Sequence, residues 1–161
     1  MADDPVALMA KRLEGTNVSP QTFLATDYLN HFNEVVMLLG MLGDMPEMFE
    51  DISAWRPKSY TQHFLDSSIA DRELAVEAYA LAPARFRTPF DATIAQADEV
   101  VARAVALIGA AIEAGDAERA AFLGGQTAQV LQRLIDVASG IIHGSEKGTS
   151  QAEIDIVLGD V

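Results

Sequence analysis

The chain has 161 residues, of which 50% are hydrophobic, and this length and composition suit one domain with a single buried core. Its 24 acidic and 11 basic residues give a formal charge of −13, which repels nucleic-acid phosphates and anionic lipid surfaces. The absence of cysteine excludes disulfides, zinc–thiolate sites and cysteine nucleophiles. No apolar run reaches membrane-spanning length and the N-terminus is acidic, so we expect a cytoplasmic protein without nucleic-acid or membrane partners.

Helical periodicity dominates the sequence, and strand-like alternation of β-branched residues is nearly absent. Asp-Pro near the start and Gly15 at the end predict a short helix over residues 4–15. A Ser-Pro pair predicts a longer helix over residues 19–43. An amphipathic piece follows over residues 44–55, and residues 59–82 give one or two helices.

Two long helices complete the predicted fold. Thr88 and Pro89 predict the start of the first, which ends at Gly115, and Asp116 caps the second, which runs to about Ile142. Because the connection is short, the two helices should lie antiparallel as a hairpin. The sequence therefore predicts an all-α protein, a four-helix-type bundle with a long antiparallel C-terminal helical hairpin and a short tethered C-terminal helix.

The C-terminal segment is expected to be separate from this bundle. Residues 1–143 form the predicted helical bundle domain, and residues 144–161 form a flexible linker plus an amphipathic docking peptide. Ser150 and Glu153 make the S-x-x-E pattern of a capping box. An apolar stripe follows at i, i+3 and i+4: Ile154, Val157 and Leu158. A helix of about two and a half turns is unstable alone in water, so it should fold in a partner's groove; the alternative is a tail that folds back on its own domain.

The last long helix has two distinct faces. A step of 100° per residue, with Leu131 as the origin, predicts a buried face. Its residues are Thr127, Leu134, Ile135, Ala138, Ile141 and Ile142. Gln129 lies about 160° from Leu131 and should project into solvent. Gly124 and Gly125, each costing about 1 kcal/mol relative to alanine, indicate close approach by a neighbouring helix or a docked partner.

Two stretches of the chain resemble one known family. The first, QTAQVLQRLIDV, resembles the active helix of the CheZ family of chemotaxis phosphatases, which reads roughly D-x-T-G-Q-V-I-x-R-x-x-D-V. The residues that match in register are Thr127, Gln129, Val130, Arg133, Asp136 and Val137. The second is the tail, which is similar to the tethered S-Q-x-x-[IV]-D-x-L-L peptide of CheZ and of FliM-type switch proteins. The matching residues are Ser150, Gln151, Ile154, Asp155 and Leu158.

The resemblance implies a function and a partner. Members of this family bind a phosphorylated response regulator of the CheY type, and a glutamine amide, here Gln129, positions water against the aspartyl phosphate. A neutral amide can donate and accept hydrogen bonds without bringing charge near the phosphate. The implied partner-binding residues are Gln126, Arg133, Asp136, Gln151, Ile154, Asp155, Val157 and Leu158. No cofactor is expected on this chain, because Mg²⁺ belongs to the regulator, and the family's paired hairpins imply a homodimer.

The sequence departs from the family pattern beside the glutamine. The family's acidic residue, four positions before the glutamine, is Gly125 here, and the family's glycine before the glutamine is Ala128. Residues 1–85 do not match the family. These departures concern catalysis more than binding, and the alternative role of Gln129 is that of an ordinary solvated helix residue.

A second interpretation rests on histidines and carboxylates. Asp27, His31 and Glu34 recur at i, i+4 and i+7, and His63 with Asp66 repeats the H-F-x-acid spacing. Such residues can form oxygen-rich metal sites between helices. The alternative function is therefore a non-enzymatic helical bundle protein that binds a metal or small molecule through His31, Glu34 and His63, with Asp66 as a further ligand. Otherwise these side chains form hydrogen bonds between helices.

Overall fold

The structure, a computed structural model, describes residues 4–145 of the chain. These residues form seven α-helices and one 3₁₀ helix, η1, and no strand occurs among them, so the all-α prediction is confirmed. The elements follow in the order α1 (Pro5–Leu13), η1 (Thr26–Leu29), α2 (Asn30–Met41), α3 (Met48–Ala54), α4 (Tyr60–Asp66), α5 (Arg72–Leu81), α6 (Ala84–Glu113) and α7 (Ala117–Ile142). Within residues 4–145, no helix combines the length and apolar character needed to cross a membrane.

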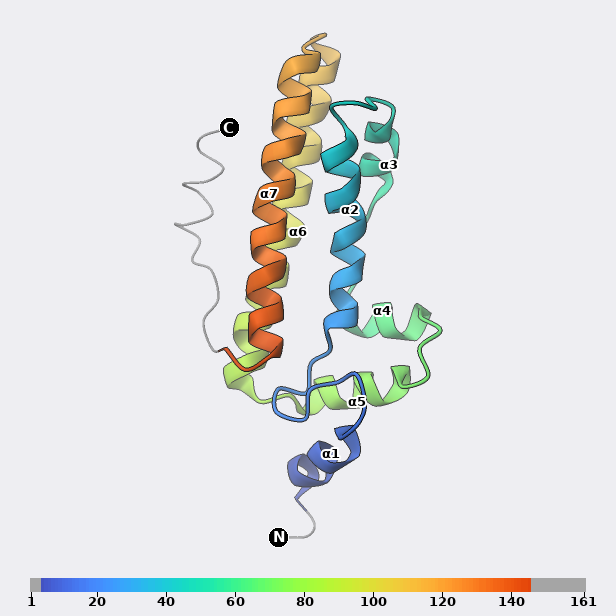
Figure 1. The fold of residues 1–161 in the computed structure, drawn as a ribbon, viewed down its shortest axis with the longest axis vertical. Coiled ribbons are helices and arrows are strands. Elements are labelled where there is room, and N and C mark those ends of the chain that lie inside the picture. Colours follow the sequence, from blue (N-terminus) through green and yellow to red (C-terminus); the bar gives the residue numbers. More distant parts are fainter. Residues whose placement is uncertain (1–3, 146–161) are drawn as a thin grey trace.

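The helices are arranged as three upright rods with shorter helices across one end (Figure 1). The helices α2, α6 and α7 run alongside one another, and α3 lies beside α2. The helices α4 and α5 lie across the end of the rods opposite the α6–α7 connection, with α1 beyond them. The main buried core lies where α2, α6 and α7 meet, and it includes Leu39, Ile108 and Leu131, which are at most 1% exposed.

The helix predicted over residues 19–43 begins later, because α2 starts at Asn30. Ser19 does not start a helix: its Oγ accepts hydrogen bonds from the backbone N–H groups of Gln21 and Thr22 and so closes a turn. Phe23 has a φ of 64°, a left-handed conformation that helices do not contain. Its ring is 1% exposed, so its burial in the core supports the unfavourable backbone conformation.

The last two helices are 30 and 26 residues long and pack against each other along much of their length (Figure 1). Gly115, between them, has a φ of 74°, and Asp116 accepts the N–H of Arg119 at 3.0 Å as the predicted N-cap. The first of the two begins at Ala84, about one turn before the predicted start, so that Pro89 lies inside the helix.

Gly124 of α7 lies close against the C-terminal end of α2. A Cβ atom placed on Gly124 would lie 2.9 Å from the carbonyl oxygen of Leu39 and 3.1 Å from a methyl of Leu42. A Cβ atom on Gly125 would meet nothing within 4 Å. The predicted buried face of α7, from Thr127 to Ile142, is buried as expected. A neighbouring helix therefore explains Gly124, and Gly125 is open on the outer side.

Candidate functional site

The outer face of α7 carries a row of polar side chains, which we call the α7 stripe. It consists of Gln129, Gln132, Arg133 and Asp136, which recur at i, i+3, i+4 and i+7 and are all exposed. Within it, the side-chain N–H of Gln132 donates to Asp136 at 3.0 Å. The exposure of Gln129 agrees with its predicted outward orientation. Gln126, another predicted partner-binding residue, is half-buried one turn before the stripe.

The backbone at Gly125, one turn before Gln129, is exposed and carries no side chain. The space around it is open. A docked domain could approach the helix closely there, because only hydrogen atoms cover the α-carbon. A Cβ atom added at this position would meet no atom of residues 4–145 within 4 Å outside its own stretch of helix.

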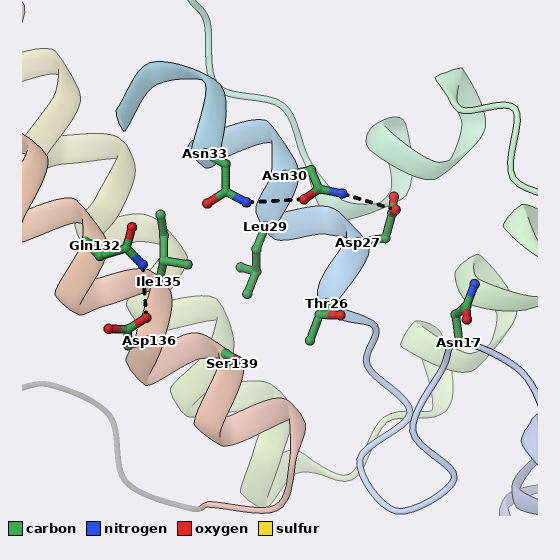
Figure 2. Close-up of a pocket in the computed structure, with 10 residues that line it drawn as sticks. All are labelled: Asn17, Thr26, Asp27, Leu29, Asn30, Asn33, Gln132, Ile135, Asp136 and Ser139. Carbon is green, nitrogen blue, oxygen red and sulfur yellow. Dashed lines mark hydrogen bonds between the residues drawn. The ribbon is translucent and has the colours of Figure 1, made fainter. Parts of the chain in front are cut away.

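A polar hollow of about 450 Å³ adjoins the stripe (Figure 2). One wall is α7, which contributes Gln132, Asp136 and Ser139, and the other is formed by η1 and the start of α2. Figure 2 shows the Gln132–Asp136 pair on one side and a line of asparagine and aspartate side chains on the other. The full lining is Asn17, Thr26, Asp27, Leu29, Asn30, Asn33, Gln132, Ile135, Asp136 and Ser139.

Hydrogen bonds order the wall opposite α7. The side-chain N–H of Asn33 donates to Asn30 at 3.2 Å, and that of Asn30 donates to Asp27 at 3.3 Å. The second oxygen of Asp27 lies 2.9 Å from Nε2 of His63. The lining contains amides and carboxylates but no lysine or arginine. The hollow therefore suits a partner group that donates hydrogen bonds or carries positive charge.

The structure does not gather the alternative metal ligands. Among residues 4–145, no group of three or more histidine, aspartate or glutamate side chains is placed to hold a metal ion. Asp66 pairs with Lys58 at 3.0 Å, and this lysine and a hydrogen bond from Gln62 hold the pKa of the carboxyl below its ordinary value. Glu34 is exposed, and His63 bonds to Asp27.

His31 instead forms hydrogen bonds with the segment that follows α3. Its Nε2 lies 2.8 Å from the carbonyl oxygen of Arg56, so this nitrogen carries the hydrogen. The indole N–H of Trp55 donates to the carbonyl oxygen of His31 at 3.1 Å, and the two rings stack with centroids 4.6 Å apart. Burial lowers the pKa of His31 below its ordinary value. We call these two hydrogen bonds, together with the stacked rings, the His31–Trp55 clasp.

The predicted tail residues lie outside the described part of the chain. These are Gln151, Ile154, Asp155, Val157 and Leu158. The docking peptide therefore stays a prediction from the sequence.

The asparagine wall of the hollow was not predicted. The sequence pattern predicts Asp27, His31 and Glu34 on one face of a continuous helix. The structure has η1 before α2, and Asp27 aligns with Asn30 and Asn33 instead. The D-x-x-N-x-x-N spacing was the available signal, because short polar side chains three residues apart in a helical segment can bond to one another.

Comparison of the chain with protein-family models, with curated proteins and with solved structures finds no match. The resemblance to CheZ therefore rests on the residue patterns of α7 and of the tail.

Proposed function

We propose that this chain binds a phosphorylated response regulator of the CheY type and accelerates hydrolysis of its aspartyl phosphate. The observation that carries the proposal is the position of Gln129, which is exposed at the centre of α7 in register with the family's glutamine. The role of Gln129 is to orient the attacking water with its carboxamide. The regulator supplies the phosphoaspartate and its Mg²⁺, and this chain binds no cofactor.

The support for α7 as a platform is its rigid attachment to the core. Leu131, Leu134 and Ala138 are at most 1% exposed and hold the helix on its inner side. A side chain on such a helix keeps its position better than one on a loop, and misplacement by about 1 Å can reduce a rate about 100-fold. A continuous helix fixes the spacing between Gln129 and the docking residues Arg133 and Asp136.

The tail is proposed as a second, independent attachment. Its S-Q-x-x-I-D-x-x-L pattern binds the regulator through Ile154, Val157 and Leu158 and holds it near α7. A tethered second site raises the local concentration of the regulator without any new contact on the stripe. The proposal further includes a cytoplasmic location, because response regulators act there.

We also propose the finer architecture that the family implies: a four-helix-type bundle whose α6–α7 hairpin forms a homodimer. Three large apolar side chains in the half of α6 and α7 next to their connection support self-association. They are Leu107, Ile112 and Phe122, which are 37%, 40% and 48% exposed. Analytical ultracentrifugation of the full chain tests this, and a monomer at micromolar concentration would contradict it.

The decisive experiment measures phosphate release from phosphorylated CheY. Wild-type protein should accelerate release, and Gln129→Ala should lose at least about 90% of that acceleration, since the amide orients the nucleophile. Gln62→Ala is the matched control, because it removes an exposed glutamine from α4 and should leave the rate unchanged. If wild-type protein releases no phosphate, the enzymatic proposal is wrong.

A second variant tests the departure at Gly125. Gly125→Asp restores the acidic residue of the family at an exposed position where an added Cβ atom meets nothing within 4 Å, so we expect a faster rate than wild type. Gly125→Asn has nearly the same shape without the charge and should not give this gain. Equal rates for the two variants would show that an acidic group at this position has no catalytic role in this chain.

Binding is measured separately from chemistry. A titration of the full chain and of a Leu158→Asp variant against CheY should show weaker binding for the variant, because the charge disrupts the apolar stripe. Equal affinities would remove the tail from the proposal and leave the α7 stripe to be tested alone.

A further inference from the structure

A separate pair of cavities lies on the side of α6 covered by the connection between α3 and α4. Their volumes are about 310 Å³ and about 270 Å³, and both are lined by Pro57 and Asp98. Asp98 therefore lies where the two cavities adjoin. Neither cavity shares a lining residue with the polar hollow beside α7. This region is independent of the proposed phosphatase site.

Aromatic rings form the wall of the larger cavity. Tyr60 stacks on Tyr79 with centroids 4.4 Å apart, and Tyr28 and Phe90 lie 5.3 Å and 5.9 Å from Tyr60. The tyrosine hydroxyls already form hydrogen bonds within the chain. Tyr79 donates to Asp91, Tyr28 donates to the carbonyl of Lys58, and Tyr60 accepts the N–H of Ala25. These bonds fix the rings, so the wall is rigid.

Asp98 is the one lining group of this region with an unused buried acceptor among the described residues. Its Oδ1 is buried and has no hydrogen-bond partner in that part of the chain. Burial raises the pKa of this carboxyl to about 6, so it is mostly ionised at neutral pH. A buried carboxylate oxygen without a donor is unfavourable, and a bound donor would relieve it.

The neighbouring cationic side chains are already engaged. Lys58 pairs with Asp66 at 3.0 Å, and Arg87 pairs with Asp91 at 3.4 Å. Arg56 donates from one guanidinium nitrogen to the carbonyl oxygens of Ser53 and Trp55. Among the described residues, no cationic side chain therefore pairs with Asp98, and above about pH 6 a cation from outside the chain would neutralise it.

We propose that this cavity binds a small organic cation with a primary ammonium group. The ammonium donates hydrogen bonds to Asp98, and the apolar body of the ligand packs along Ile94 and the edge of the Tyr79 ring. The faces of that ring are covered by Tyr60 and the Arg87 guanidinium. A carboxylate attracts an ammonium, and aromatic walls favour cations and apolar groups over anions.

The volume is at the lower end of that of small-molecule sites, which limits the ligand to a compact molecule. The cavity has two carboxylates, Asp98 and Asp91, and Asp91 is already bonded to Tyr79 and Arg87. This set does not provide the shell of about six or more oxygen ligands that Mg²⁺ or Ca²⁺ requires.

An NMR titration of the full-length ¹⁵N-labelled chain with 2-phenylethylammonium chloride tests the proposal. We expect saturable shifts of backbone signals around Asp98 and Tyr79. Asp98→Asn should weaken binding by about tenfold or more, because it removes the charged acceptor and keeps the shape. Glu99→Gln is the matched control: it removes the same charge from the next, exposed position of α6 and should change the affinity less than about twofold.

Two further measurements separate the chemistry from unspecific binding. The neutral analogue 2-phenylethanol has the same shape without the ammonium and should bind at least about tenfold more weakly. Tyr79→Leu, which removes a ring and keeps Asp98, should weaken the ammonium ligand by about threefold or more, and its spectrum shows whether the chain is folded.

The following results would overturn the proposal: no saturable shift at roughly 10 mM ligand, equal binding of 2-phenylethanol, or unchanged binding by Asp98→Asn. Shifts confined to Gln132 and Asp136 would also overturn the proposal, because they would place the ligand in the polar hollow beside α7.

Discussion

The polar hollow beside α7 and the cavity around Asp98 both contain carboxylates, but the hydrogen bonding of these carboxylates differs between the two sites. In the hollow, Asp27 is bonded to Asn30 and His63, and Asp136 accepts a hydrogen bond from Gln132. Around Asp98 the neighbours are aromatic rings and cations bonded elsewhere, and one carboxylate oxygen is left without a donor. A surface whose polar groups are already paired is ready to meet another protein without reorganising. A buried unpaired group favours a small ligand of opposite charge.

The largest expected effect tests the packing of α2 against α7, the two helices that supply most of the walls of the hollow. Gly124→Leu should lower the free energy of unfolding by about 2–4 kcal/mol, because even a Cβ atom there would lie 2.9 Å from the carbonyl of Leu39. Gly125→Ala is the control, and it should raise stability by about 1 kcal/mol, since its added methyl group meets nothing. Urea denaturation of both variants measures the difference. Equal effects would mean that α2 does not pack on α7 as described.

The next effect concerns the unpaired carboxylate. Burial raises the pKa of Asp98 from its ordinary value of 3.8 to about 6, so the folded chain holds a proton that the unfolded chain releases between these pH values. The contribution of Asp98 to stability is therefore present at low pH and is lost as pH rises through about 6. Asp98→Asn should raise the free energy of unfolding by about 1–2 kcal/mol at pH 8, after allowance for partial solvent contact.

Comparing the variant with wild type at each pH removes the contribution of the other acidic residues. At pH 4 the difference should nearly vanish, because the carboxyl is protonated in the folded wild type. A variant that is less stable than wild type at pH 8 would show that Asp98 has a favourable partner, and the contrast with the hollow would then be lost.

A smaller effect distinguishes the two carboxylates of the hollow. Asp27→Ala should reduce stability by about 1 kcal/mol, because it leaves His63 and Asn30 without their acceptor in a half-buried position. Asp136→Ala should change stability by less than about 0.5 kcal/mol, since its single hydrogen bond is on the surface. Thermal unfolding of the two variants measures both effects. A larger loss of stability for Asp136→Ala than for Asp27→Ala would contradict the inference that the hydrogen bonds of Asp27 contribute more to the fold.

The parts of the fold that sequence reasoning predicted are those set by local chemistry. The Asp4 and Asp116 caps, the stop at Gly115 and the inner face of α7 follow from neighbouring residues and helical periodicity. The start of α2 was misplaced because Phe23 adopts a left-handed conformation and Ser19 closes a turn, and burial in the distant core supports this arrangement.

The sites were harder to predict than the helices. The exposure of Gln129 followed from its angle on α7, because a long helix fixes the direction of each side chain. The cavity around Asp98 could not be predicted, since its walls come from η1, α4, α5 and α6, and only tertiary packing brings these elements together. The proposed metal ligands do not come together for a similar reason: His31 bonds to Arg56 and stacks on Trp55, and His63 bonds to Asp27.

The His31–Trp55 clasp governs more than the shape of one connection. Trp55, Arg56 and Pro57 line the smaller cavity, and the clasp holds this segment against α2. Loss of these two hydrogen bonds and of the stacked ring pair would therefore change the shape of this wall of the smaller cavity. A histidine that does not line the cavity would thus help to set the shape of the space that a guest meets.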